Sequence, residues 1–262
     1  MGHLAPSTRP ASSILLEVCV ESVEDALTAD AGGADRLELN SALSLGGLTP
    51  SPGTFLETRR QTQLPLLVMI RPRRSGFCYS DREFRTMLRD AEWFLEQGAD
   101  GLVSGFLNQN GEIDQARSLE LRKLCVAQEA VFHRAFDLTA DPFASLEKLI
   151  DLGIHRILTS GQAASALEGS DLLNRLVTTA RGRIEILPAG GIKAATIAEL
   201  LQRVDCNQVH GSLRKEYVDS FLQRHSQVSF GSLTRTCEAH YDNTHLEAVR
   251  ELRAALDRMQ KT

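Results

Sequence analysis

Three stretches of the chain repeat one pattern: AGGADRLEL (31–39), EQGADGLVSG (96–105) and DLGIHRILTSG (151–161). In each stretch a glycine follows a helical pattern, and a short apolar strand begins two or three residues later. Glycine readily adopts the left-handed conformation that ends a helix, so each stretch is typical of the turn from a helix into the next strand. The repetition predicts a series of β–α units.

Eight strand-like segments lie along the chain, and each but the last is closely followed by a helical pattern. They are short runs rich in branched apolar residues, as in parallel strands that are buried on both faces. The segments span 14–20, 35–39, 66–71, 101–104, 130–133, 156–159, 183–187 and 207–210. Eight units without an interrupting domain predict an α/β fold, a single (β/α)8 TIM barrel, which typically needs about 250 residues. An open doubly wound sheet is the alternative, but it needs a glycine fingerprint after its first strand, and EVCVESVEDA (17–26) has none.

The two ends of the chain depart from this pattern. Residues 1–13 have no apolar core and predict a short, flexible, disordered N-terminal tail, which leaves 14–262 as the barrel domain. After the eighth strand, residues 211–243 form a long polar, extended segment before an amphipathic helix over 244–259. Segments of that length within a domain are usually functional or bridge subunits.

Composition excludes several classes of protein. The 262 residues are 42% hydrophobic and 24% charged, which excludes a disordered or fibrous chain. The net charge of −5, with basic residues dispersed, argues against bulk binding of nucleic acid. No apolar run approaches the roughly 18–20 residues of a membrane-spanning helix, so we expect no membrane partner. Five cysteines without a CxxC pair predict a reducing compartment, the cytoplasm.

Carboxylates occur near the ends of the first two strands. Glu17 alternates with Cys19 on the first strand, and Glu38 alternates with Asn40 on the second, so each pair shares one face. If both faces point inward, Glu17 and Glu38 meet in the barrel mouth and either bind a divalent metal or supply an acid/base group. The alternative is that each carboxylate pairs with an inward arginine, such as Arg71 or Arg134, and only shapes the core.

Arginines and a cysteine follow the third strand in the motif IRPRRSGFCYSD (70–81). Arg71 and Arg73 are expected at the barrel mouth beside Cys78. The planar guanidinium matches carboxylate or phosphate, which favours a small anionic ligand. The alternative is that these arginines neutralise the carboxylates of the first two strands.

The motif FHRAFD (132–137) ends the fifth strand. His133 is the candidate general base, because histidine titrates near neutrality. Asp137 is expected to orient either His133 or Arg134. The alternative is a buried, hydrogen-bonded histidine without a catalytic role.

The last three strands end in small polar residues and glycines. Glycines after the seventh and eighth strands let backbone N–H groups approach an anion, and many barrels hold phosphate there. Alternatively, they are ordinary turn residues. The expected anion-binding residues are Arg71, Arg73, Arg134, Ser160, Gly190, Gly191, Gly211 and Ser212.

Several motifs together resemble the CutC family of copper homeostasis proteins, in register from residue 16 to about residue 214. They are LEVCVES, GADRLEL, GGLTPS, IRPR, FCYSD, GADGLVSG, FHRAFD, LTSGQ and PAGGI. The resemblance implies a TIM barrel, a cytoplasmic location and a homo-oligomer, either a dimer or a tetramer. It also implies a role in copper tolerance, with Cu(I) bound through cysteines.

The copper-binding residues that the resemblance implies are only partly present. The family's first cysteine is Cys19, whereas Asn40 and Gly211 occupy positions where the family often has cysteine. Two-coordinate Cu(I) prefers two soft ligands, so the second ligand must come either from Cys78, if its loop folds over the barrel mouth, or from a neighbouring subunit.

Three functions therefore remain open. The first is a copper homeostasis protein that binds Cu(I) through Cys19, with help from Cys78 or a neighbouring subunit. The second is an enzyme that acts on a small anionic or phosphorylated metabolite, with His133, Glu17 and Glu38 as its acid/base groups. The third is a non-catalytic barrel whose C-terminal segment mediates assembly.

Overall fold

Eight parallel strands form the centre of the computed structural model, which describes residues 14–225, 227 and 239–259. Their order is β7-β6-β5-β4-β3-β2-β1-β8, and a parallel bridge from Ala189 to His210 links β7 to β8. The strands are β1 (Leu15–Val20), β2 (Arg36–Leu39), β3 (Leu66–Met69), β4 (Gly101–Ser104), β5 (Glu129–Phe132), β6 (Arg156–Thr159), β7 (Glu185–Pro188) and β8 (Gln208–Gly211). The predicted TIM barrel is confirmed, whereas the expected tail over 1–13 lies outside the described residues.

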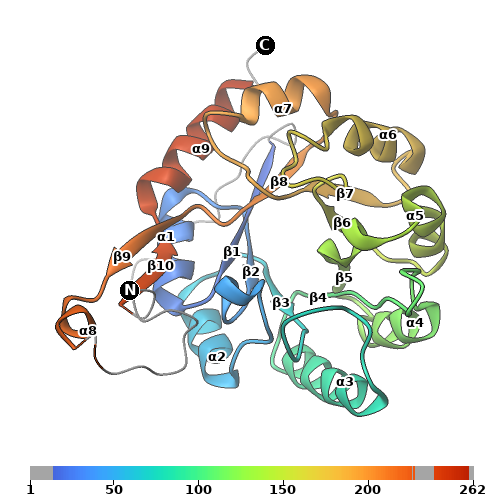
Figure 1. The fold of residues 1–262 in the computed structure, drawn as a ribbon, viewed down its shortest axis with the longest axis horizontal. Coiled ribbons are helices and arrows are strands. Elements are labelled where there is room, and N and C mark those ends of the chain that lie inside the picture. The colour runs from blue at the N-terminus through green and yellow to red at the C-terminus, as the bar shows by residue number, and fades with distance from the viewer. Residues whose placement is uncertain (1–13, 226, 228–238, 260–262) are drawn as a thin grey trace.

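Helices surround the strands in Figure 1, with α9 beside α1. They are α1 (Val23–Gly32), α2 (Pro52–Gln61), α3 (Asp81–Glu96), α4 (Gln115–Leu124), α5 (Pro142–Asp151), α6 (Ser170–Ala180), α7 (Ile197–Arg203), α8 (Ser220–Arg224) and α9 (Leu246–Met259), with the short 3-10 helices η1 (Leu43–Leu45) and η2 (Arg134–Leu138). Among the helices in the described ranges, none combines the length and the apolar character needed to cross a bilayer.

Local sequence signals explain where the helices begin and end. Ser80 accepts a hydrogen bond from the backbone of Glu83, and the Glu83 side chain accepts one from the backbone of Ser80, which makes a capping box at the start of α3. Gly33 ends α1 with a φ of 93°, the left-handed conformation that the repeated glycines predict. These signals place the helix ends close to the predicted positions.

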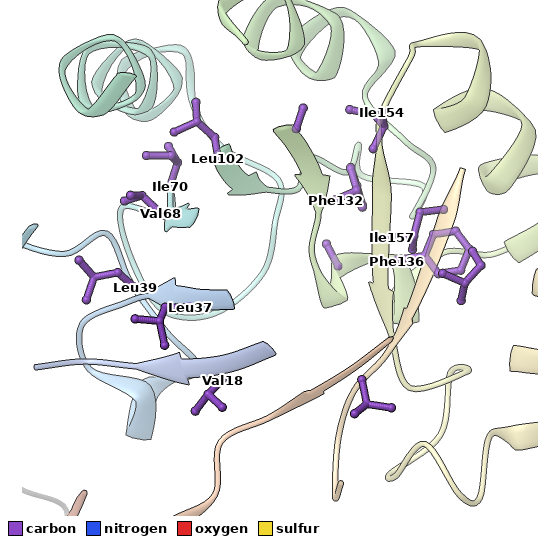
Figure 2. Packing of buried hydrophobic residues seen from close by; sticks show 14 of the residues in the cluster. Val18, Leu37, Leu39, Val68, Ile70, Leu102, Phe132, Phe136, Ile154 and Ile157 are labelled. Carbon is purple, nitrogen blue, oxygen red and sulfur yellow. The ribbon is translucent and has the colours of Figure 1, made fainter. Parts of the chain in front are cut away.

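The apolar core has two layers. The larger layer lies between the strands and the helices, and Figure 2 shows Val18, Leu37, Leu39, Val68 and Phe132 in it. The smaller layer fills the inside of the barrel, below the mouth. Its members are Leu67, Met69, Val103, Val131, Leu158, Leu187 and Ala189. A filled interior confines any binding site to one end of the strands.

The segment after β8 contains more regular structure than its polar pattern predicts. Strands β9 (Arg214–Val218) and β10 (His240–Thr244) pair as an antiparallel ribbon, with α8 next to β9 in the chain. This arm lies at the lower left of Figure 1, away from the barrel strands. A two-stranded ribbon buries few side chains, so its sequence carries little of the apolar alternation by which a strand is recognised.

Candidate functional site

A cavity of about 690 Å³ is lined by residues that follow the strands at their carboxyl ends. Its polar lining comes from β1, β2, β8 and the start of β9, and from the segments that follow β2, β3, β5, β7 and β8. The lining includes Cys19, Glu38, Asn40, Arg71, His133, Arg134, Gly190, Gly191, Lys193, His210, Gly211, Ser212 and Arg214. Nine of the fourteen candidate site residues therefore lie around one cavity.

Glu17 lies beneath this cavity and is almost fully buried, with 1% of its surface exposed. It pairs with Arg36, and its Oε1 atom lies 2.7 Å from Nδ1 of His210. Arg36 also donates to the side chain of Gln208 at 2.9 Å. Burial alone would raise the pKa of Glu17, but Arg36 and His210 outweigh burial and hold that pKa below its usual range. Glu17 therefore forms its ion pair with Arg36 rather than with Arg71.

Glu38 lines the cavity and keeps one oxygen free of protein partners. Its Oε1 atom accepts a hydrogen bond from Asn40 at 2.9 Å, whereas Oε2 is buried without a partner among the described residues. Burial raises the pKa of Glu38 above its ordinary value. Glu38 therefore has the environment expected of an acid/base group.

His210 was not singled out from the sequence, although it stands directly before Gly211. Burial disfavours its charged form, but Cys19, Glu17 and Glu38 outweigh this and raise the pKa of His210 well above its ordinary value. Ligand atoms of Glu17, Glu38 and His210 lie within 4.8 Å of one another, so this group could hold a metal ion. The register of neighbouring strands, Glu17 opposite His210 and Cys19 opposite Glu38, brings them together.

Arg71 is 6% exposed and is held by backbone carbonyl groups. Its Nη1 atom donates to Gly46 at 2.9 Å and Gly47 at 3.1 Å, and its Nη2 atom donates to Ser75 at 2.9 Å. Its Nε atom is buried and has no hydrogen-bond partner in the described ranges. No carboxylate in the described part of the chain pairs with Arg71, which therefore brings to the cavity a positive charge that meets carbonyl oxygens and the face of the Phe77 ring but no negative charge.

Arg73 and Cys78 do not reach the cavity. Arg73 pairs with Glu83 in the first turn of α3 and lies over the ring of Tyr79, 5.1 Å from its centroid. It also donates to the carbonyl oxygen of Cys78 at 3.1 Å, and the Cys78 side chain is exposed. Neither residue is therefore part of the cavity lining that contains Cys19 and Arg71.

His133 is buried, with 3% of its surface exposed, and it starts η2. Its Nδ1 atom accepts a hydrogen bond from the backbone N–H of Ala135 at 3.2 Å, and its Nε2 atom has no partner among the described residues. Burial, reinforced by the positive charge of Arg71, lowers the pKa of His133 to about 3. The imidazole is therefore neutral at physiological pH.

Asp137 orients Arg134, not His133. It accepts hydrogen bonds from Nε of Arg134 at 2.8 Å, from the Thr159 hydroxyl at 2.5 Å and from the Ser160 backbone at 3.0 Å. Arg134 also donates to the hydroxyl of Ser160 at 2.8 Å. The guanidinium of Arg134 is thereby fixed at the edge of the cavity.

Glycines bring backbone close to that guanidinium. Gly190 and Gly191 have φ values of 93° and 69°, which favour glycine. A Cβ atom on Gly190 would lie 3.5 Å from Arg134 Nη1, an ordinary contact distance, so the positive φ rather than crowding favours glycine here. Lys193 and Arg214 also line the cavity, and neither was singled out from the sequence.

Among the residues that the structure describes, one cysteine lines the cavity. Cys19 is 7% exposed and interacts with His210, while Asn40 is fully buried and bonded to Glu38. Met69 adds a thioether to the lining. The soft ligands around the cavity are thus one thiol and one thioether, together with the imidazole of His210.

Comparison with known proteins gives consistent matches. The model of the CutC family matches residues 14–215. A CutC family protein of Treponema denticola is 44% identical over 219 residues, covering 84% of this chain and 89% of that protein. The human copper homeostasis protein cutC homolog is 43% identical over 244 residues, covering 93% and 89%. A solved structure of CutC from Streptococcus agalactiae superposes with a TM-score of 0.72 at 34% identity, covering 76% of this chain and 98% of that one.

Proposed function

The chain belongs to the CutC family of copper homeostasis proteins, and we propose that its barrel mouth is the active site of an enzyme that acts on a small anionic metabolite. The observation that carries this proposal is the environment of Arg71. A buried charge normally has a charged partner, because burying an ion without one is costly. Within the described ranges Arg71 donates hydrogen bonds to backbone carbonyl groups and lies over the ring of Phe77, but it has no carboxylate partner, and it lines the cavity. An anionic ligand would supply the missing charge.

Other groups complete the anion site. Arg134, held by Asp137 and Ser160, lies beside the glycine turn at Gly190 and Gly191. Gly211 and Ser212 line the same cavity after β8. Backbone N–H groups after the last two strands of a barrel commonly bind phosphate, so a phosphorylated compound fits this set of donors.

Glu38 is the acid/base group of the proposed enzyme. Its unpaired Oε2 atom and its raised pKa set it apart from Glu17, whose two oxygens are occupied by Arg36 and His210. Two buried carboxylates with opposite pKa shifts are the usual sign of divided roles. Glu17 thus holds His210 in place, and Glu38 exchanges protons with the ligand.

A screen of small anions by thermal unfolding tests this proposal. A ligand that binds only the folded state raises the midpoint temperature of unfolding. At a ligand concentration about one hundred times the dissociation constant, it stabilises the folded protein by about 2.7 kcal/mol. We expect phosphate esters or small carboxylates to stabilise the wild type and not Arg71→Met. If every stabilising anion acts equally on both proteins, the proposal is wrong.

A second candidate function is Cu(I) binding, which the names of the relatives favour. The specific observation is the contact between Cys19 and His210 beside the cavity, with Met69 in the lining. A thiol, an imidazole and a thioether are ligands that copper accepts. Exposed Cys78 lies outside the cavity, so His210 replaces it as the second ligand in this proposal.

An anaerobic Cu(I) competition titration distinguishes the copper hypothesis. If Cys19 binds copper, Cys19→Ser loses Cu(I) affinity, whereas Cys78→Ser keeps it. Weak binding that is unchanged in Cys19→Ser would remove copper binding at this cavity and leave the anion site untouched.

Assembly and location remain part of the proposal. The arm formed by β9, α8 and β10 exposes Tyr217, Val218, Phe221 and Tyr241, and we propose that it joins copies of the chain into a dimer or tetramer. The described cysteines Cys19, Cys78, Cys125 and Cys206 are all free, which favours a cytoplasmic protein.

A further inference from the structure

We propose that His133 serves the cavity as a hydrogen-bond donor and that the ligand presents a carbonyl oxygen to its Nε2 atom. The inference rests on the anionic ligand proposed above and narrows its class to small anionic ketones or aldehydes. It also changes the role of His133 from the general base expected from the sequence to a group that polarises a carbonyl.

The tautomer of His133 follows from one hydrogen bond. A backbone N–H can only donate, so Nδ1, which receives the N–H of Ala135 at 3.2 Å, is the ring nitrogen without a proton. In a neutral imidazole the other nitrogen, Nε2, then carries the proton. Ala135 is fully buried in η2, which holds this arrangement in place.

The Nε2–H group of His133 lacks an acceptor. It is buried, and the residues that the structure describes offer it none. Buried donors are almost always paired, so an unpaired one at a cavity calls for a partner outside the chain. His133 lines the cavity, and a ligand oxygen there would satisfy the donor.

Protonation of the ring is opposed by its surroundings. Burial and Arg71 keep the pKa of His133 far below neutrality, so the ring does not accept a proton from a ligand at physiological pH. A neutral imidazole N–H stabilises the negative charge that develops on a carbonyl oxygen when a proton leaves the neighbouring carbon. This complements Glu38, which is the proton-exchanging group in the proposed function.

Two neighbours fix the ring and place it near the cation. The ring of Phe77 lies 4.8 Å from the ring of His133, and the guanidinium carbon of Arg71 lies 4.9 Å from the same phenyl centroid. Gly105 faces the imidazole so closely that a Cβ there would lie 2.4 Å from its Cε1 atom. The donor and the cation are therefore both neighbours of Phe77, and one small molecule can carry both the anion and the carbonyl.

The test compares two phosphate esters that differ only at the carbonyl. Hydroxyacetone phosphate has a ketone where n-propyl phosphate has a methylene, and both carry the same anionic group. We expect calorimetry to show that the wild type binds the ketone at least about tenfold more tightly, because a site built around a donor rejects an analogue without the acceptor.

Two variants assign that preference to His133. In His133→Phe the affinity for hydroxyacetone phosphate should fall to about that for n-propyl phosphate, while n-propyl phosphate binds as it does to the wild type. In His133→Gln, whose amide keeps an N–H donor, part of the preference should return. A preference that survives in His133→Phe, or equal affinities in the wild type, would overturn the inference.

The result also separates this inference from the proposed function. If both esters bind equally and their binding depends on Arg71, the proposed anion site is supported and only the role of His133 is overturned. If neither ester binds at millimolar concentration, the proposed site for phosphorylated ligands fails, and this inference fails with it. A nitrogen NMR spectrum of histidine-labelled protein, assigned with His133→Gln, must additionally show a proton on Nε2 and none on Nδ1.

Discussion

The backbone N–H of Ala135 donates to Nδ1 of His133 at 3.2 Å, and this single bond determines what the histidine can do. With Nδ1 occupied, the ring directs an N–H group, not a lone pair, away from η2. The free lone pair that a general base requires is absent in this arrangement. The acid/base chemistry therefore moves to Glu38, across the same cavity.

The neutral state of His133 predicts a specific pH dependence of stability. The folded pKa is about 3, and an unfolded histidine titrates at about 6.5. Between these values the unfolded chain binds a proton that the folded protein excludes, so the free energy of unfolding falls as the pH falls below about 6.5. The titration of His133 alone should lower the free energy of unfolding by about 2 kcal/mol between about pH 7 and about pH 5.

Urea unfolding of the wild type and of His133→Gln at both pH values measures this effect. Since the variant lacks the titrating ring, its loss of stability on acidification should be smaller by that amount. Parallel losses in the two proteins would show that His133 is protonated in the folded state, contrary to this account.

Because the Asp137 side chain accepts several hydrogen bonds, we expect its removal to lower the stability of the protein strongly. Asp137→Ala leaves the hydroxyl of Thr159, the backbone of Ser160 and the guanidinium of Arg134 without their shared acceptor. The expected loss in the free energy of unfolding is about 3 kcal/mol. Asp141→Ala, which removes only the N-cap of α5, should lose about 1 kcal/mol. Equal losses would mean that the Asp137 network adds nothing beyond an ordinary cap.

Much of the fold was predictable from local pattern. Glycines such as Gly33 and Gly98, followed by branched apolar runs, marked where the strands begin, and all eight strands lie within about two residues of their predicted ends. The site was harder to predict. Glu17 and Arg36 pair across neighbouring strands, and the sequence does not show which of several arginines a buried carboxylate will meet.

Loop paths caused the remaining differences. Arg73 and Cys78 follow β3 as Arg71 does, but Arg73 pairs with Glu83 of α3 and the Cys78 side chain is exposed, whereas Phe77 of the same loop lines the cavity. No periodicity encodes such a path. His210 was identifiable in principle, because strand alternation places it on the inward face together with Gln208.

The exposed arm predicts how copies of the chain associate. If it is the interface, replacing both Phe221 and Tyr241 with serine should convert the oligomer to monomer, because 61% and 49% of these side chains are exposed in the single chain. Sedimentation velocity measures the change. Val126→Ser is the control, since Val126 is 89% exposed but lies outside the arm. A wild type that sediments as a monomer, or a double variant that stays oligomeric, would contradict the proposed interface.

The most direct test of the central claim is a calorimetric titration of hydroxyacetone phosphate into the wild type, Arg71→Met and Arg73→Met. The two variants remove the same charge from the same loop, but only Arg71 lines the cavity, whereas Arg73 is paired with Glu83. We expect Arg71→Met to weaken binding at least about tenfold, since charged hydrogen bonds contribute about 1.5–3 kcal/mol, and Arg73→Met to bind like the wild type. Equal weakening in both variants, or no weakening in Arg71→Met, would contradict an anion site at the barrel mouth.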